Sequence, residues 1–448
     1  MLALSGACGF RWRGVKDSIA GWGRRRGRTT ALLRSLRLRF KRRGAGRGSS
    51  RPSGRPVVSF TDVTDERIAL YELDRPALTD WVVSLGQPRY RADQLWRWLY
   101  LGLVQDFEAM TDLPRAFRAE LEAGARLSRL ELVASTESQD SPAVKYLFRL
   151  SDGQQIETVL MHFLDPADAE EDESPSGGDS PPAPAVRHTV CLSTQAGCAM
   201  GCVFCATGQM GLQRDLSVGE CIEQVIFCAR RLRQLGQPLS NVVFMGMGEP
   251  LANWAATWST VERLTDADGL ALGARRITIS TVGIVPGIRR LATAGKPVRL
   301  AVSLHAPDNA LRDRLVAVNR TYDLEAILAA CRDYQAAGGR RITFEYVLID
   351  GVNDRPAQAR ALAARLLGLR AHVNLIPLNP TQGSPLLPSP YDRALAFETA
   401  LQAAGIGTTL RMRRGIDVQA GCGQLRSRVG DGRLGRSIPL FDATGEPA

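Results

Sequence analysis

The stretch Cys198-Ala199-Met200-Gly201-Cys202-Val203-Phe204-Cys205 places three cysteines at the spacing C-x3-C-x2-C. It follows an apolar, β-branched run of strand length, Thr189–Thr194. Three thiolates on one loop can bind three corners of a [4Fe–4S] cluster and leave the fourth iron without a protein ligand. Such an open iron can bind a substrate or a cofactor. This loop is therefore the candidate centre of the chemistry.

Two other uses of clustered cysteines compete with the cluster: a structural zinc site and a redox pair. Structural zinc usually takes four ligands, often from paired C-x2-C units, and no second pair of this kind follows. Cys191 could complete a four-thiolate zinc site, so zinc stays open on spacing alone. The chain has 9 cysteines in 448 residues and no signal-peptide pattern, so a reducing, cytoplasmic compartment is expected.

Beyond the cysteine loop, apolar runs of strand length alternate with helical patterns, which predicts parallel strands joined by helices. The strand-length runs are Thr189–Thr194, Asn241–Met245, Arg276–Thr281, Arg299–Leu304, Ile342–Ile349 and His372–Leu378. The helical patterns are Ser217–Leu235, Trp254–Asp266, Pro286–Ala294, Asp323–Ala337 and Pro356–Leu367. These units are too few for a closed eight-stranded barrel. We expect an α/β fold, either a partial (β/α)6 barrel or an open sheet, over residues 186–425, and then a tail at 426–448.

Three further segments precede this core. Residues 57–135 show helical periodicity and predict a small helical accessory domain. Residues 136–164 predict a β-hairpin, because two alternating runs are joined by Ser151-Asp152-Gly153. Residues 165–185 are acidic and rich in Pro, Ser and Gly, which is typical of a flexible linker.

The net charge of +11 is unevenly distributed. Residues 1–56 carry 16 Lys or Arg and one acid, so they predict a disordered arm, either a solvated tail or an RNA-gripping segment. The other residues sum to −4, with seven of their acids in the stretch Asp165–Asp179. Binding to a polyanion is therefore allowed by the charge of the body. No apolar run approaches the ~20 residues of a membrane span, so none is expected.

The cysteine loop resembles that of the radical S-adenosylmethionine (SAM) superfamily. Gly246-Met247-Gly248-Glu249-Pro250, after the second predicted strand, is similar to the superfamily's motif for the SAM amino group. Glycines let backbone approach a ligand, and a carboxylate suits an ammonium. The resemblance implies one [4Fe–4S] cluster on Cys198, Cys202 and Cys205. It also implies that SAM binds the open iron and is cleaved there to a 5′-deoxyadenosyl radical.

A late cysteine narrows the resemblance. Cys422 lies between two glycines in Gln419-Ala420-Gly421-Cys422-Gly423-Gln424-Leu425. Together with Thr189–Ser193, Met245–Pro250, Ser303–Pro307 and Asn374–Pro380, it resembles the RlmN family. These are bacterial dual-specificity methyltransferases for adenines of 23S rRNA and tRNA, and the similarity runs from Leu73 to Leu425.

That resemblance implies a reaction using two SAM molecules per turnover. Cys422 would take a methyl group from the first SAM, and the second, cleaved at the cluster, would activate this methyl for addition to C2 of adenine. Cys191 would release the product by forming a disulfide with Cys422, and Glu157 would accept a proton. The implied product is 2-methyladenosine at adenosine 2503 of 23S rRNA and adenosine 37 of certain tRNAs.

The resemblance also maps seven positions onto contacts with SAM: Gly248, Glu249, Ser280, Ser303, Leu304, His305 and Asn379. By residue type alone some of these have plainer explanations. His305 could be a structural histidine at a strand end, and Ser280 ordinary strand filler. Glu157 alone would be taken for a solvent-facing carboxylate. The three remaining helical cysteines, Cys221, Cys228 and Cys331, are expected to be packed in the core.

Alternatives and partners follow from the same comparison. The related Cfr-type enzymes share the cluster and both thiols but methylate C8 and give antibiotic resistance; the long helical region before the core favours RlmN. A non-catalytic zinc- or RNA-binding protein is a different class. Expected partners are 23S rRNA, tRNA and an electron donor such as flavodoxin or ferredoxin, with the chain a monomer. Candidate phosphate contacts are Arg89, Arg91, Arg411, Arg413 and Arg414.

Besides the arginine-rich arm of residues 1–56, which is not a family feature, two features depart from the family pattern. The acidic segment 165–185 lengthens the connection between Glu157 and Cys191. His162 stands where the family commonly has proline. Neither touches the cysteine loop, the Gly-Glu-Pro turn or Cys422.

Overall fold

The computed structural model describes residues 67–139, 142–163, 187–381, 384–411, 421 and 423–425. The predicted arm, the acidic linker, Cys422 and the tail lie outside these residues. The chain divides into two units, Met1–Val63 and Thr64–Ala448, and every described residue belongs to the second. None of the described helices is long and apolar enough to span a membrane.

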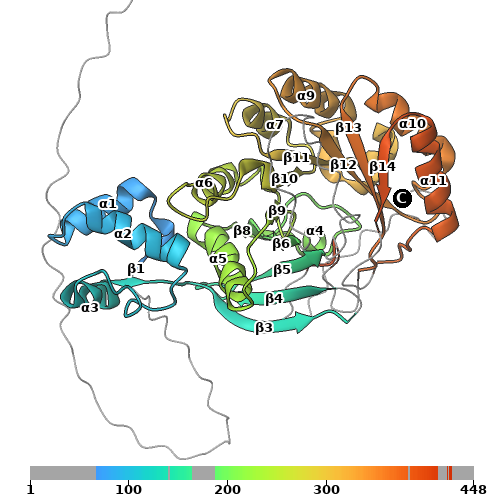
Figure 1. The fold of residues 1–448 in the computed structure, drawn as a ribbon. Coiled ribbons are helices and arrows are strands. Elements are labelled where there is room, and N and C mark those ends of the chain that lie inside the picture. Colours follow the sequence, from blue (N-terminus) through green and yellow to red (C-terminus); the bar gives the residue numbers. More distant parts are fainter. Residues whose placement is uncertain are drawn as a thin grey trace, which may run out of the picture. The chain divides into compact units, whose positions relative to one another are not determined.

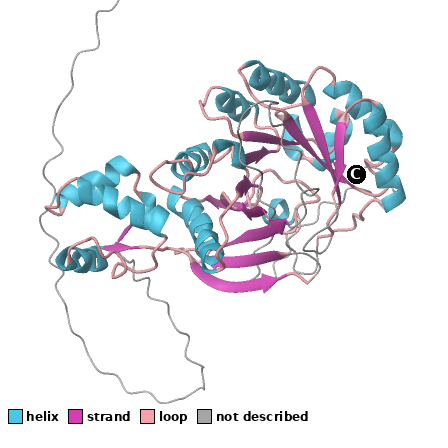
Figure 2. Ribbon diagram, in the orientation of Figure 1, coloured by secondary structure: helices cyan, strands magenta, loops and turns pink. Residues whose placement is uncertain are grey.

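A ten-stranded mixed sheet organises the described chain (Figure 1, Figure 2). Its strand order is β14-β13-β12-β11-β10-β9-β6-β5-β4-β3. From β6 to β14 neighbouring strands pair in parallel, whereas β3, β4, β5 and β6 pair antiparallel. The strands are β3 Glu131–Glu137, β4 Ala143–Arg149, β5 Gln155–Phe163, β6 Arg187–Cys191, β9 Asn241–Phe244, β10 Ile277–Thr281, β11 Arg299–Ser303, β12 Ile342–Leu348, β13 Ala371–Pro377 and β14 Gly407–Leu410.

Helices follow the parallel strands and cover one face of the sheet (Figure 1). In β12, Phe344 and Tyr346 are fully buried on that face, and the Tyr346 ring lies 5.1 Å from the ring of Phe397 in a helix. The alternate residues therefore point to the opposite, inner face. The helices are α5 Val218–Gln234, α6 Trp254–Leu264, α7 Val285–Ala292, α8 Asn309–Leu315, α9 Leu324–Ala336, α10 Pro356–Leu366 and α11 Tyr391–Ala403.

The accessory domain precedes the sheet in the sequence and has an aromatic core. Trp96 and Tyr100 are buried with ring centroids 4.3 Å apart, and Tyr71 meets Tyr100 edge-on at 5.6 Å. Asp74 caps the first helix by accepting from the Ala77 amide at 2.8 Å. Its elements are β1 Ile68–Ala69, a 3-10 turn Leu70–Glu72, α1 Arg75–Ser84, α2 Tyr90–Arg97, a π-helical turn Trp98–Gly102, α3 Arg115–Gly124 and β2 Ala125–Arg126.

Polar side chains join this domain to the start and middle of α5. Glu72 accepts from the Ser217 hydroxyl at 2.5 Å and from the Gly219 amide at 3.1 Å, at the N-terminus of the helix. Arg230 donates to the Leu103 carbonyl at 3.0 Å. Because these hydrogen bonds run between the accessory domain and α5, they fix the accessory domain to that helix.

The six predicted strands and five predicted helices are all present, each within about three residues of its expected bounds. The hairpin is larger than expected: β3 precedes it, and β5 continues into the main sheet through the pair Val159 and Cys191. Residues 131–135, expected in the helical domain, instead belong to strand β3. This strand is exposed along almost all of its length, so it lacks the alternation that marks a half-buried strand.

Glu223 in α5 makes folding stability depend on pH. Burial raises its pKa from 4.5 to about 7, although one oxygen accepts from the Ser128 hydroxyl at 2.6 Å and the Arg129 amide at 2.7 Å. The folded state holds this proton more tightly than the unfolded chain does. The resulting contribution to the free energy of unfolding is therefore fully present below pH 4.5 and is lost as the pH rises through 7. Glu223→Gln should remove this loss and gain up to about 3 kcal/mol relative to wild type between pH 5 and 8.

Urea unfolding at several pH values measures that difference. Glu262→Gln, at an exposed position of α6, is the matched control and should track the wild type. A difference between Glu223→Gln and wild type that does not change with pH would contradict the assignment.

Candidate active site

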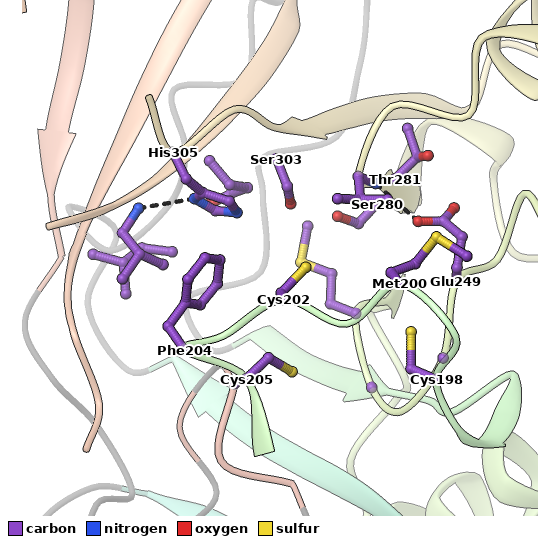
Figure 3. A pocket seen from close by; sticks show the side chains of 18 of the residues that line it. Cys198, Met200, Cys202, Phe204, Cys205, Glu249, Ser280, Thr281, Ser303 and His305 are labelled. Atoms are coloured by element: carbon purple, nitrogen blue, oxygen red, sulfur yellow. Dashed lines mark hydrogen bonds between the residues drawn. The ribbon is translucent and has the colours of Figure 1, made fainter. Parts of the chain in front are cut away.

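A cavity at the C-terminal ends of the parallel strands gathers most of the predicted site residues (Figure 3). It holds about 940 Å³ of empty space, which includes space open to solvent. Ligands in α/β folds bind at this end of the strands. The predicted residues that line it are Cys198, Cys202, Cys205, Gly248, Glu249, Ser280, Ser303, His305 and Asn379.

The cysteine loop is held in place by backbone hydrogen bonds along its length. It lies between two short antiparallel strands, β7 Gln195–Gly197 and β8 Leu212–Asp215. The Cys198 amide donates to the Gly211 carbonyl at 3.0 Å, and the Val203 amide donates to the Leu315 carbonyl at the end of α8 at 3.1 Å. The loop conformation is thus set by the protein itself.

The three thiols fit an iron–sulfur cluster better than a single zinc ion. All three line the cavity, and burial raises the pKa of each, that of Cys198 to about 12. A bound metal removes such protons outright. Within the described part of the chain, no three His, Cys, Asp or Glu side chains converge closely enough to hold one metal ion. A cluster presents separate irons to its ligands and so suits thiols that are set further apart.

The Gly-Glu-Pro turn packs closely against the strand that precedes the cysteine loop. A Cβ on Gly246 would lie 2.5 Å from the Leu192 carbonyl oxygen, so only glycine fits there. The buried Glu249 carboxyl accepts from the Leu251 amide at 3.0 Å and from the Val282 amide at 2.8 Å. Burial nevertheless raises its pKa to about 7. Glu249 therefore ties the loop after β9 to the loop after β10 at the cavity wall.

His305 is held in place by the structure, as expected of a structural histidine, and it also lines the cavity, as expected of a SAM contact. Its backbone has φ of 61°, a left-handed conformation that is rare outside glycine and is often found at functional sites. The Val347 amide donates to its Nδ1 at 3.1 Å, so the proton is on Nε2, and burial lowers its pKa to about 3. The Phe204 ring packs edge-on at 4.7 Å (Figure 3). A neutral, fixed imidazole thus lines the cavity.

Leu304 lies behind the cavity wall, and Glu345 is a lining residue that the sequence prediction missed. Leu304 is buried, and its amide donates to the Glu345 carbonyl at 3.0 Å. The Glu345 carboxylate accepts from the Asn374 side chain at 3.1 Å on the inner face of the sheet. A single acidic residue inside the apolar strand Ile342–Leu348 was the available signal.

The residues on either side of Cys422 are described and lie against the cysteine loop. The Ala206 amide, next to Cys205, donates to the Gly423 carbonyl at 2.7 Å, and the Thr207 hydroxyl donates to the Leu425 carbonyl at 2.7 Å. A Cβ on Gly421 would lie 2.6 Å from the Asn379 amide nitrogen. Gly423 itself lines the cavity. Cys422 is outside the described residues.

Glu157 and Cys191 share the inner face of the sheet but are not among the residues that line the cavity. Val159 pairs with Cys191 and with Lys145, and Glu157 lies two residues from Val159, so all four point to one side. Lys145 Nζ lies 3.1 Å from Glu157 Oε1. Glu157 is only 3% exposed, which corrects the reading of it as a solvent-facing carboxylate.

The disulfide implied between Cys191 and Cys422 is not supported: the part of the chain that the structure describes holds no disulfide, and Cys191 is buried. A bond formed only during turnover would be absent from the resting protein. Cys221, Cys228 and Cys331 are fully buried, as expected for core cysteines.

Comparison with known proteins gives two matching family models. Residues 192–363 match the radical SAM superfamily, and residues 68–127 match the ribosomal RNA large subunit methyltransferase N-terminal domain. The second match coincides with the accessory domain. The two models therefore account for both parts of the fold.

Whole proteins are similar over nearly their full length. A probable dual-specificity RNA methyltransferase RlmN of Chloroflexus aurantiacus is 46% identical over 394 residues, covering 85% of this chain and 99% of that protein. Dual-specificity RNA methyltransferase RlmN 1 of Myxococcus xanthus is 46% identical over 376 residues, covering 84% and 99%. The crystal structure of a radical SAM methyltransferase from Sphaerobacter thermophilus is 48% identical, with a TM-score of 0.74, and covers 80% of this chain and 99% of that one. The chain therefore belongs to the RlmN family of dual-specificity RNA methyltransferases, within the radical SAM superfamily.

Proposed function

We propose that this protein methylates C2 of adenine, at adenosine 2503 of 23S rRNA and adenosine 37 of certain tRNAs. The observation that carries the proposal is the meeting of three segments at one cavity. These are the three-cysteine loop, the Gly-Glu-Pro turn and the segment that flanks Cys422. Family membership supplies the reaction class, and this meeting supplies a place for it.

Two cofactors fit the cavity. Cys198, Cys202 and Cys205 would hold a [4Fe–4S] cluster, which when bound supplies one electron for the cleavage of SAM. The SAM positions would be Gly248, Glu249, Ser280, Ser303, Leu304, His305 and Asn379. Of these all but Leu304 line the cavity, and Leu304 is buried behind its wall. A reduced flavodoxin or ferredoxin would be the electron source.

Cys422 would carry the methyl group and Cys191 would resolve the covalent adduct. Gly423 lines the cavity and Gly421 packs on Asn379, which supports a position for Cys422 beside the SAM site. Its thiolate takes a methyl group from one SAM, and a second SAM is used to activate it. Attack of the Cys191 thiolate on the Cys422 sulfur would then form the S–S bond of a transient disulfide and break the bond from that sulfur to the methylene carbon, which takes a proton and leaves as the methyl group of the product.

Glu157 would accept the proton that adenine C2 loses. Its burial keeps water from competing, and Lys145 at 3.1 Å stabilises its ionised form, which is the form a base requires. Because Glu157 and Cys191 share a face, proton removal and adduct release would occur on the same side of the substrate.

The RNA base must leave any stack to reach a cavity at the strand ends. Among the arginines considered for phosphate contact, Arg89 is exposed. The Arg91 side chain is already hydrogen-bonded within the accessory domain, because it donates to the Gln94 side chain at 2.7 Å and to the Asp112 carbonyl at 3.0 Å. Arg89 is therefore the better candidate of the two. Arg413 and Arg414 lie outside the described residues.

Product analysis tests the regiochemistry and the role of Cys422 together. Anaerobically reconstituted protein, with SAM, a reductant and unmodified 23S rRNA fragment, should yield 2-methyladenosine detectable by mass spectrometry of digested nucleosides. Cys422→Ala should abolish this product while keeping wild-type iron, because Cys422 is not a cluster ligand. Formation of 8-methyladenosine, or no methylation by protein with an intact cluster, would refute the proposal.

Iron content tests the cysteine loop. Cys198→Ala removes one of three thiolates, so we expect loss of most bound iron and sulfide and of the visible absorbance after reconstitution. Cys331→Ala, in the core of α9, is the matched control and should retain both. Colourless wild-type protein that binds zinc stoichiometrically would support the binding-protein alternative instead.

Glu157→Gln tests the proposed proton acceptor. The amide keeps the shape but cannot take the proton, so RNA methylation should slow by roughly 10²-fold or more. Iron content and methylation of Cys422 should be unchanged, since neither needs this group. Glu131→Gln, at an exposed position of β3, is the control. Unaltered turnover in Glu157→Gln would assign the proton transfer elsewhere.

A further inference from the structure

A fully buried arginine, Arg312, lies beside the cysteine loop and has no part in the roles described so far. It belongs to α8, and its residue is 0% exposed. The last residue of that helix, Leu315, accepts the hydrogen bond from the Val203 amide inside the loop. The helix therefore brings a permanent positive charge next to the three thiols.

Within the described residues, the guanidinium of Arg312 donates hydrogen bonds only to uncharged oxygen atoms. Nε donates to the Leu304 carbonyl at 3.0 Å, and Nη2 donates to the Ser303 carbonyl at 3.0 Å and to the Val282 carbonyl at 2.6 Å. Nη1 donates to the Asn319 side-chain oxygen at 2.9 Å. These carbonyls come from the ends of β10 and β11, so one side chain fixes two edges of the cavity.

No described carboxylate forms an ion pair with this buried cation. Asp313 is linked to it only through an amide, because Asn319 Nδ2 donates to Asp313 Oδ1 at 2.6 Å. Burying a cation without an anion is costly, and removing its partner normally destabilises a protein. Burial lowers the Arg312 pKa only to about 10, so the group stays charged at neutral pH. The charge therefore needs a partner that the protein side chains do not supply.

The cysteine loop provides such a partner once a cluster is bound. Three thiolates carry three negative charges against the two positive charges of an oxidised [4Fe–4S] core, and an added electron makes the site more negative still. In a buried site a fixed cation nearby favours that electron. Arg312 and Cys202 interact electrostatically, which agrees with this arrangement.

We propose that Arg312 is a positioning residue with two tasks: it is the counter-charge that makes the cluster easier to reduce, and it clamps the loops after β10 and β11 that border SAM. The inference rests on the proposed function only in requiring a cluster on the three cysteines. The electron comes from an external one-electron reductant, such as dithionite, and no bond is made or broken at Arg312.

Three variants separate charge from shape. Arg312→Gln removes the charge and much of the clamp. The double variant Asp313→Asn with Asn319→Asp exchanges an acid and an amide, so net charge and their mutual hydrogen bond are kept, but the anion moves onto Arg312. Arg312→Lys keeps the charge and loses the planar fork. Arg320→Gln, exposed in the turn after α8, is the control.

The measurement is an anaerobic redox titration of reconstituted protein without SAM, followed by electron paramagnetic resonance and by iron and sulfide assay. Arg312→Gln and the exchange variant should both hold full iron and sulfide. At a fixed potential, their ratio of reduced to oxidised cluster should be about tenfold lower than in wild type, which corresponds to 59 mV for a one-electron couple. Arg312→Lys should keep the wild-type ratio and bind SAM more weakly. The exchange variant tests the charge even if Arg312→Gln fails to fold.

An unchanged ratio in the exchange variant, with iron and sulfide intact, would overturn the counter-charge role whether or not the protein methylates RNA. If wild-type protein methylates no adenine but the variants still show the expected shift in the ratio of reduced to oxidised cluster, the proposed function is refuted and the role of Arg312 is supported. Wild-type protein that binds no iron and sulfide would overturn both.

Discussion

The backbone hydrogen bonds of the cysteine loop are the constraint on which the site depends. Thiols can share one cluster only if their carrier loop is fixed, and this loop is fixed from three directions. Gly211, just before β8, holds its start, Leu315 at the end of α8 holds its middle, and Gly423 holds its end through the Ala206 amide. Those partners lie far apart in sequence, so the sheet and its connecting segments must fold before three cysteines become a site.

Strand β6 joins two halves of the sheet that do different work. On one side, parallel strands place backbone turns and short polar side chains around the cavity. On the other, antiparallel strands place Lys145 and Glu157 on the inner face. Cys191 is the last residue of β6, and the cysteine loop begins seven residues later. A single strand therefore belongs to both halves, and its last residue, Cys191, shares the inner face with Glu157.

The sequence was informative where local pattern and local chemistry coincide. Alternating apolar runs located the strands from β6 to β13, and the spacing of three cysteines located the loop between the first strand and first helix. It was silent on Arg312, because a buried charge is recognised only from partners that are distant in the chain, and for Glu345 its only signal was one acid in an apolar run. Glu157 illustrates the same point: its burial depends on pairing with β4 and β6, which no local pattern records.

Phe163 and Arg187, the described residues that flank the acidic segment, pair with each other at the end of the sheet opposite the cavity. Arg187 is the first residue of β6, whereas the cavity lies beyond the C-terminal end of that strand. Next to this pair, His162 pairs with His188, with their Nδ1 atoms 2.6 Å apart. One imidazole nitrogen donates to the other, so this contact links the side chains of the two strands. The strands that carry Glu157 and Cys191 are therefore joined by backbone and side chains at the end of the sheet away from the cysteine loop.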